Sequence, residues 1–273
     1  MLGAIIGDMV GSPYEFHPWQ GAAEAFPLFS PRSRFTDDTV MTVAVARGLM
    51  QAYGQEQACR EAFIDAMHEY GRAYSRAGYG QRFFRWIVTG SRAPYNSFGN
   101  GSAMRVSPVG LYASSLDEAL ELARITASVS HNHPEGIKGA EAIAMAIYLA
   151  RIGTPMEQIR RRMSGYYPEI ASMTVDGIRP GYGYDEAGQW ITCQGSVPQA
   201  IVCFLESTSF EDAIRNAVSL GGDTDTQGCM AGAIAEAYYG IPEDIGETAK
   251  SFLTYDLLEV VEKFYNKLQK SQY

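Results

Sequence analysis

The stretch TDDTVMTVAVARGLM, residues 36–50, places two adjacent acids directly before a run that is apolar on nearly every side. Such a run predicts a helix buried all round, with Thr36 as its N-cap. A second stretch, GGDTDTQGCMAGAIAEAYY at residues 221–239, repeats this arrangement near the other end of the chain. Because helical side chains lean toward the N-terminus of their helix, the acids of each first turn can reach an ion that lies just beyond that end of the helix. The two stretches therefore predict two halves of one metal site.

Helical patterns occupy most of the remaining chain. Residues 164–196 are rich in Gly, Tyr and Pro without a sustained period, so we expect a long irregular connection there, of a kind that is often functional. The sequence contains no linker, repeat or low-complexity tract. We predict an all-α fold, a compact single-domain orthogonal helical bundle over residues 1–273 around a binuclear metal site. Further helices are expected at 56–77, 116–129, 134–148, 155–163, 197–207, 210–219, 243–251 and over the C-terminal segment 257–268.

Composition narrows the classes of protein to consider. With 273 residues, 46% of them hydrophobic, the chain can bury a sizeable core. The net charge of -9 makes nucleic acid an unexpected primary partner. The four cysteines are far apart and form no cluster with histidine, which disfavours structural zinc or disulfides and favours a cytoplasmic location. The apolar opening is cut short by Asp8, so we expect neither a secretory signal nor a membrane span.

Five carboxylates are the candidate metal ligands or acid–base groups: Glu15, Asp37, Asp38, Asp223 and Asp225. An aspartate before a helix is ordinarily an N-cap, and that interpretation fits any one of them. Capping uses one acceptor per helix end, whereas each aspartate doublet supplies two charges that repel each other in apolar surroundings. A bound cation would relieve the repulsion, and oxygen ligands favour magnesium, manganese or calcium over zinc. Because two divalent ions balance five negative charges better than one does, we predict a binuclear site.

A second constellation is GNGSAMR at residues 99–105, followed by two histidines. Its Asn-Gly pair can adopt positive φ and open a run of backbone N–H groups that would cradle phosphate, with Arg105 nearby. The same pair is, by itself, also typical of an ordinary turn. Phe98 could stack on an aromatic base or fill the core. His131 and His133 could bind metal, but without further His or Cys nearby they are better interpreted as hydrogen-bond donors, His131 to a phosphate or ribose.

Five segments taken together and in order resemble the ADP-ribosylglycohydrolase family. The family includes the dinitrogenase reductase-activating glycohydrolase and eukaryotic hydrolases acting on ADP-ribosylated arginine or serine. The resemblance runs from about residue 3 to residue 242 and implies a compact all-α fold around two divalent cations, Mg²⁺ or Mn²⁺. The segments are GDMVGSPYE at 7–15, FTDDT at 35–39, GNGSAMR at 99–105, SH at 130–131 and GGDTDT at 221–226.

The resemblance also implies roles for individual residues. Glu15 would lie beside the metals as a ligand or movable acid, Phe98 near the adenine, and the Asn-Gly-Ser loop around the diphosphate. Residues 91–99 contain no carboxylate, where some arginine-directed members are expected to carry one, so the resemblance does not extend to arginine specificity. The implied metal ligands are Thr36, Asp37, Asp38, Asp223, Asp225 and Thr226. The implied substrate-binding residues are Phe98, Gly99, Asn100, Gly101, Ser102, Met104, Arg105 and His131.

The activity expected from the resemblance is metal-dependent hydrolysis at the anomeric carbon of the distal ribose, releasing ADP-ribose from a modified protein or a small ADP-ribosyl conjugate. Glu15 is the first candidate for general acid or base, followed by Asp38 and Asp225, because a carboxylate held by two ions is a weaker base. Prenyl-diphosphate synthases also use paired aspartates, but their DDxxD spacing is absent here. The alternative is a non-catalytic ADP-ribose binder or a crystallin-like structural relative, which a turnover assay would distinguish.

Overall fold

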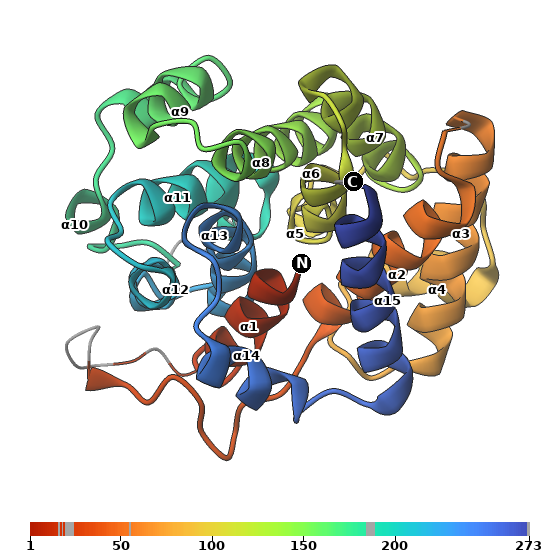
Figure 1. Cartoon of the computed structure of the whole chain (residues 1–273), viewed down its shortest axis with the longest axis horizontal. Coiled ribbons are helices and arrows are strands. Elements are labelled where there is room, and N and C mark those ends of the chain that lie inside the picture. Colours follow the sequence, from red (N-terminus) through yellow and green to blue (C-terminus); the bar gives the residue numbers. More distant parts are fainter. Residues whose placement is uncertain (16, 18, 20–24, 55, 184–188, 272–273) are drawn as a thin grey trace.

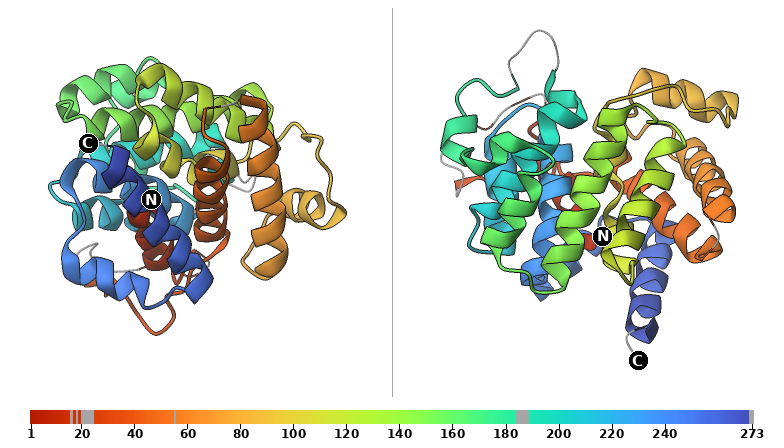
Figure 2. Two further views of the ribbon diagram at one scale, coloured as in Figure 1. Left: turned by 45° about the vertical axis from the view of Figure 1, so that its right-hand side comes forward. Right: turned by 90° about the horizontal axis from the view of Figure 1, so that it is seen from above.

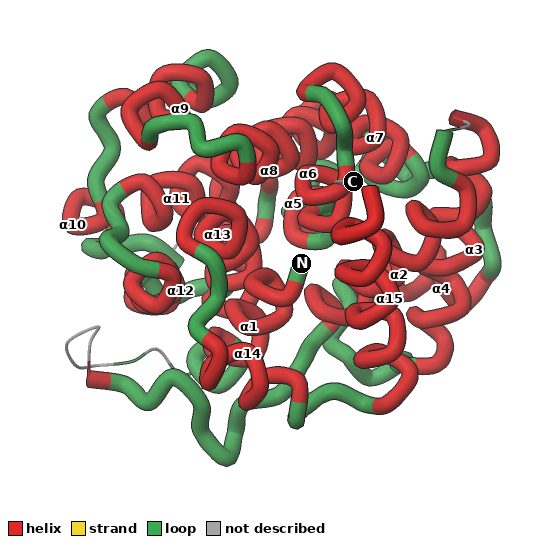
Figure 3. Tube along the Cα trace, in the orientation of Figure 1, coloured by secondary structure: helices red, strands yellow, loops and turns green. Residues whose placement is uncertain are grey.

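The computed structural model describes residues 1–15, 17, 19, 25–54, 56–183 and 189–271. This part of the chain is helical and contains no β-strand, only an isolated bridge between Gly99 and Thr192 (Figures 1 and 3). The prediction of an all-α fold is confirmed. The helices are α1 (Leu2–Gly11), α2 (Asp37–Ala52), α3 (Glu56–Ala73), α4 (Gln81–Thr89), α5 (Gly101–Met104), α6 (Ser107–Tyr112), α7 (Leu116–Ser128), α8 (Pro134–Arg151), α9 (Met156–Met163), α10 (Val175–Ile178), α11 (Cys193–Leu205), α12 (Phe210–Ser219), α13 (Thr224–Tyr239), α14 (Glu243–Lys250) and α15 (Tyr255–Ser271).

The predicted helices form, and the predicted cap Thr36 is confirmed. The Thr36 hydroxyl accepts a hydrogen bond from the backbone of Asp38 at the start of α2, and the Ser115 hydroxyl caps α7. Helix α11 begins at Cys193, four residues before the predicted start, because Thr192 caps it by accepting from a backbone N–H of its first turn. The predicted connection 164–196 is therefore shorter and contains α10 and two 3₁₀ turns, while residues 184–188 lie outside the described chain.

Five helices, α1, α4, α5, α6 and α10, were not predicted from the sequence. The most important is α1, which has every residue buried and lies at the centre of the molecule (Figures 1 and 2). Helix α1 is apolar on nearly every side, so its sequence lacks the alternating apolar and polar faces that mark an amphipathic helix. Its three glycines also lower its helix propensity. The sequence pattern therefore did not predict this helix. None of the described helices is both long and apolar enough to cross a bilayer.

Helices α1 and α13 pack backbone against backbone. A Cβ atom added to Gly7 would lie 1.9 Å from the carbonyl oxygen of Gly228, and one added to Gly232 would lie 2.3 Å from that of Gly3. Glycine is required here because any side chain would force the two helices apart. This close approach places Asp8, in the middle of α1, beside Asp225 in the first turn of α13.

Candidate active site

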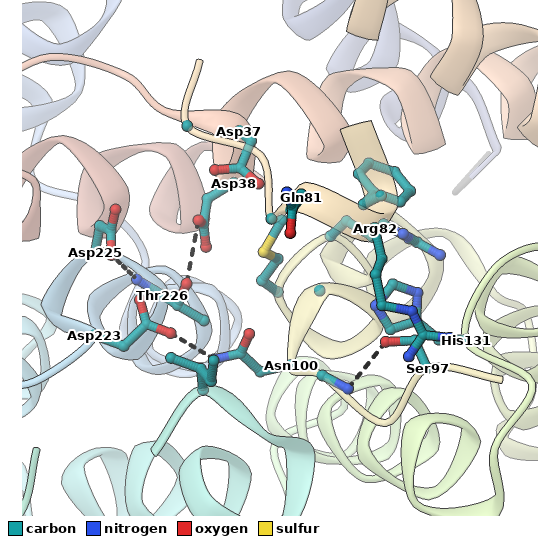
Figure 4. Close-up of a pocket in the computed structure, with 18 of the residues that line it drawn as sticks. Asp37, Asp38, Gln81, Arg82, Ser97, Asn100, His131, Asp223, Asp225 and Thr226 are labelled. Atoms are coloured by element: carbon teal, nitrogen blue, oxygen red, sulfur yellow. Dashed lines mark hydrogen bonds between the residues drawn. The ribbon is translucent and has the colours of Figure 1, made fainter. Parts of the chain in front are cut away.

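A cavity of about 380 Å³ lies where α2, α4, α5 and α13 meet, and residues from both ends of the chain line it. Figure 4 shows aspartates on one side, Arg82 and His131 on the other, and Asn100 between them. The acidic end consists of Glu15, Asp37, Asp38, Asp223, Asp225 and Thr226, and the cationic end of Arg82 and Arg105, with His131 beside them. The remaining lining residues are Gly78, Gly80, Gln81, Phe83, Tyr95, Ser97, Gly99, Asn100, Gly101, Met104 and Ile191.

The acidic end brings together the carboxylates that the two sequence stretches predicted. Oxygens of Asp8, Asp38 and Asp225 lie within 4.8 Å of one another, and so do oxygens of Glu15, Asp223 and Asp225. Asp225 belongs to both groups. One oxygen of Asp38 accepts from the Thr226 hydroxyl at 3.2 Å, while the other is buried without a hydrogen-bond partner among the described residues. Buried, unsatisfied carboxylate oxygens in an all-oxygen set fit hard divalent cations such as Mg²⁺ or Mn²⁺.

Electrostatics supports the same interpretation. Burial, reinforced by the charge of Asp225, raises the pKa values of Asp37, Asp38 and Asp223 well above the usual range. Burial likewise raises the pKa of Glu15 to about 8, with Asp225 adding to the effect and Arg34 opposing it. Carboxyl groups with such pKa values retain protons near neutral pH unless another positive charge takes their place. The acidic end thus needs cations to ionise fully.

None of these aspartates behaves as an ordinary helix cap. Thr36 occupies the N-cap position of α2, and Asp37 and Asp38 follow it in the first turn. Asp223 occupies the N-cap position of α13 but makes no capping hydrogen bond; its carboxylate accepts from the side-chain amide of Asn100 at 2.6 Å. The N-cap interpretation is therefore wrong for Asp223, and its carboxylate faces the cavity.

Asp8 is a site residue that the sequence reasoning missed. Its fully buried carboxylate accepts hydrogen bonds from the backbone N–H and hydroxyl of Thr36, each at 2.8 Å, and from the same two groups of Thr39. Asp8 thereby fixes the first turn of α2, and burial raises its pKa to about 7. A single acid inside an otherwise apolar segment was the available signal, because a charged residue is rarely buried without a specific role.

The loop that carries Asn100 differs from its prediction. Asn100 has φ of −71° and Gly101 is not among the glycines with positive φ, so the expected positive-φ turn is wrong. Asn100 instead occupies the N-cap position of α5, and its carbonyl accepts from the backbone N–H groups of Ala103 and Met104. Gly101 is needed for a different reason, since a Cβ there would lie 3.1 Å from Nε2 of His131.

Two of the substrate-binding residues implied by the resemblance do not line the cavity, and neither does the implied metal ligand Thr36. The buried Ser102 hydroxyl donates to the carbonyl of Gly136 at 2.7 Å and lies beside the Cys193 thiol, so it is engaged in packing α5 against α8 and α11. Phe98 is 41% exposed, and its ring lies 5.2 Å from that of His133. Met104 and Gly99 do line the cavity.

At the cationic end, the guanidinium of Arg105 has no carboxylate partner within the part of the chain that the structure describes. Arg105 is fully buried; its Nη2 donates to the Thr126 carbonyl and the Ser130 hydroxyl, each at 2.9 Å, while Nε and Nη1 have no partner among the described residues. Burial lowers the pKa of Arg105 to about 10, which still leaves it charged at neutral pH. Arg82 lies over the Tyr95 ring, 4.9 Å from its centroid. This end of the cavity is suited to an anion.

Known proteins resemble the chain over nearly its whole length. A family model described as ADP-ribosylglycohydrolase matches residues 1–273. Human ADP-ribosylhydrolase ARH3 is 29% identical over 347 aligned residues, covering 99% of this chain and 93% of the human protein. The mouse protein of the same name is 29% identical, with 94% and 88% covered. A solved structure described as an ADP-ribosylglycohydrolase-related protein complex matches with a TM-score of 0.67 at 25% identity, over 97% of this chain and 95% of that one.

Proposed function

This chain belongs to the ADP-ribosylglycohydrolase family and is a glycosidic-bond hydrolase, and we propose that it removes ADP-ribose from a modified acceptor with two divalent cations, Mg²⁺ or Mn²⁺. The observation that carries the proposal is the polarity of the cavity. Among the described residues that line the cavity, those of the acidic end include no cation and those of the cationic end include no carboxylate. Divalent cations would supply the positive charge at the acidic end, and ADP-ribose would fit both ends. Its ribose hydroxyls can bind the cations, and its diphosphate carries the negative charge that suits the cationic end.

The metal ligands that we propose are Asp37, Asp38, Asp223 and Asp225, with Thr36, Thr226 and Glu15 close by. Asp225 belongs to two clusters of carboxylates, and one oxygen of Asp38 has no hydrogen-bond partner among the described residues. Both observations support a site for more than one ion. When bound, such ions would polarise ribose oxygens and neutralise the buried carboxylates. Asp8 acts through Thr36 and Thr39, whose positions it fixes by hydrogen bonds.

Glu15 is the residue that we propose moves the proton. In the reaction the bond from the anomeric carbon to the acceptor breaks, water supplies the new oxygen on that carbon, and one proton passes to the acceptor. Glu15 lines the cavity and is only half-buried, whereas Asp38 and Asp225 are almost completely buried. It is therefore better placed to exchange protons, with Asp38 and Asp225 as the next candidates.

The cationic end would hold the diphosphate, and we propose that the backbone of Gly99 to Ser102, with Met104, Arg105 and His131, surrounds it, with Phe98 near the adenine. The acceptor is a protein side chain or a small ADP-ribosyl conjugate. The net charge of -9 disfavours nucleic acid as the primary partner. All four cysteines are buried thiols outside any disulfide, which fits the cytoplasmic location that we propose.

In the decisive experiment, metal-stripped protein is incubated with a panel of ADP-ribosylated substrates, with and without added Mg²⁺ or Mn²⁺. The ADP-ribose in these substrates is attached to arginine, serine, a nucleic-acid base or acetate. We expect free ADP-ribose from at least one substrate, and only when metal is added. Binding of ADP-ribose without turnover of any substrate would favour the non-catalytic alternative. Absence of both binding and turnover in folded, metal-loaded protein would refute the proposed function.

A further inference from the structure

Three side chains form a hydrogen-bonded chain that leads from the buried guanidinium to the cavity. Nη2 of Arg105 donates to the Ser130 hydroxyl at 2.9 Å, and that hydroxyl lies 2.8 Å from Nδ1 of His131. All three residues are buried, with Arg105 and Ser130 completely inaccessible and His131 4% exposed. Solvent therefore does not compete for these contacts.

The chemistry of the three groups fixes the direction of this chain. A guanidinium can only donate, so the Ser130 oxygen must accept from Arg105. Ser130 has one hydroxyl hydrogen, and among the described residues His131 Nδ1 is the acceptor in reach. Acceptance at Nδ1 gives this hydrogen a partner, whereas donation from Nδ1 would leave it without one among the described residues. A neutral imidazole that accepts at Nδ1 carries its hydrogen on Nε2.

The surroundings of His131 keep its imidazole ring uncharged, and the second ring nitrogen, Nε2, faces the cavity. Burial lowers the pKa of His131 well below its usual value, and the nearby positive charges of Arg105 and Arg82 lower it further. Tyr95, whose ring lies 5.8 Å from the imidazole, is itself neutral because burial raises its pKa to about 12. Nε2 lies against Gly101, which lines the cavity.

We propose that Arg105 and Ser130 are positioning residues that hold His131 as the neutral tautomer with hydrogen on Nε2, so that His131 presents a fixed N–H donor to the cavity. His131 then acts neither as a base nor as a metal ligand through Nε2, which decides between the two interpretations that the sequence left open. The identity of the group that accepts from it, a phosphate or ribose oxygen of ADP-ribose, rests on the proposed function.

Nitrogen-15 NMR of histidine-labelled, ligand-free protein tests the tautomer directly. We expect a pyrrole-type Nε2 and a pyridine-type Nδ1 for His131, assigned by their loss in His131→Asn. His133 serves as an internal reference, because its Nδ1 accepts from the backbone N–H of Glu135 and it should show the same pattern. A doubly protonated His131 near pH 6.5, or hydrogen on Nδ1, would overturn the proposal.

Two variants test the relay itself. Ser130→Ala should give a mixture of tautomers at His131 and leave His133 unchanged, while Ser128→Ala, a nearby serine whose hydroxyl donates to the Ile125 carbonyl, should change neither. In Arg105→Met, loss of the neighbouring cation should raise the pKa of His131. An unchanged tautomer in Ser130→Ala would remove Ser130 from the relay, and an unchanged titration in Arg105→Met would remove Arg105.

ADP-ribose binding, measured by calorimetry, separates this inference from the proposed function. We expect Ser130→Ala to weaken binding roughly 3- to 10-fold, the effect of one misdirected hydrogen bond, and Ser128→Ala to bind as the wild type does. If the wild-type protein binds no ADP-ribose, the proposed function fails, whereas the NMR result still decides the state of His131. If Ser130→Ala shows mixed tautomers but full affinity, the donor role toward ADP-ribose is refuted.

Discussion

The two ends of the cavity are built by different means. The acidic end rests on α1, α2 and α13. Helices α1 and α13 approach so closely that a Cβ atom added to Gly7 or Gly232 would lie 1.9 or 2.3 Å from a carbonyl oxygen of the opposite helix, and the carboxylates held there repel one another. The cationic end rests on the short helix α5, the start of α4 and the residues before α8, and its geometry comes from side-chain hydrogen bonds. Close packing of two backbones can hold like charges near one another, whereas side-chain contacts alone would let those charges move apart. We therefore expect substitutions at the acidic end to affect metal binding and catalysis, and those at the cationic end to affect ligand affinity.

The largest effect is expected from Asp225→Asn, because Asp225 belongs to both carboxylate groups. Replacing its carboxylate by an amide removes a charge but little volume, so release of ADP-ribose should fall roughly 10³-fold or more, the value of several kcal/mol of charge stabilisation. Circular dichroism and the melting temperature should show an intact fold. Asp176→Asn, at an exposed aspartate paired with Arg179 on α10, is the matched control and should retain full activity. Near-wild-type turnover in Asp225→Asn would exclude a joint metal site.

A second effect should come from Gly7→Ala, which tests the packing beneath the acidic end without touching a carboxylate. The new methyl group would overlap the Gly228 backbone, and we expect a loss of about 1–3 kcal/mol in unfolding free energy. Metal affinity should fall as well, because Asp8 and the first turn of α13 would move apart. Gly246→Ala is the control, since the nearest atom to its added Cβ is 3.6 Å away and alanine favours the helix. Equal metal affinity in Gly7→Ala and wild type would show that the glycine contact does not position the ligands.

The acidic end should also make stability depend on pH when metal is absent. The pKa of Glu15 rises from 4.5 to about 8 on folding. Its stabilising contribution is therefore complete below about pH 4.5 and is lost as pH rises through about 8. Metal-free wild type should lose unfolding free energy over this range more steeply than Glu15→Gln, as measured by urea unfolding. Excess metal should reduce the difference, because cations replace the protons. Parallel pH profiles for the two metal-free proteins would contradict the raised pKa of Glu15.

Much of the fold follows from patterns that lie within one segment. The apolar runs at 36–50 and 221–239, each preceded by acids, predicted α2 and α13 and the meeting of their first turns. Helix α1 gave no such signal, because its partner is a glycine stripe more than 200 residues away. Gly7 could be understood only once Gly228 was known to face it.

The same limit applies to the site. Asp37 and Asp225 stand in conspicuous doublets, whereas Asp8 is a single acid whose four hydrogen bonds depend on how α1 meets α2. The partner of Asn100 is Asp223, which no local pattern could indicate. The direction of the Ser102 hydroxyl is likewise set by α8, outside its own motif. Residue types were predictable from sequence, and side-chain directions required tertiary contacts.

The smallest effect is expected at the rim of the cationic end, from Arg82→Gln. Arg82 is exposed, and its guanidinium is held over Tyr95 beside the cavity, so its attraction for an anion is weakened by solvent and salt. ADP-ribose affinity should fall about 2- to 5-fold at low salt and less at high salt, while metal affinity stays unchanged. Arg85→Gln, at an exposed arginine of the same helix that does not line the cavity, controls for net charge and should have a smaller effect. Calorimetry at two salt concentrations measures both variants. Equal losses in the two would mean that only overall charge matters, and a loss of metal affinity in Arg82→Gln would show that the two ends do not work separately.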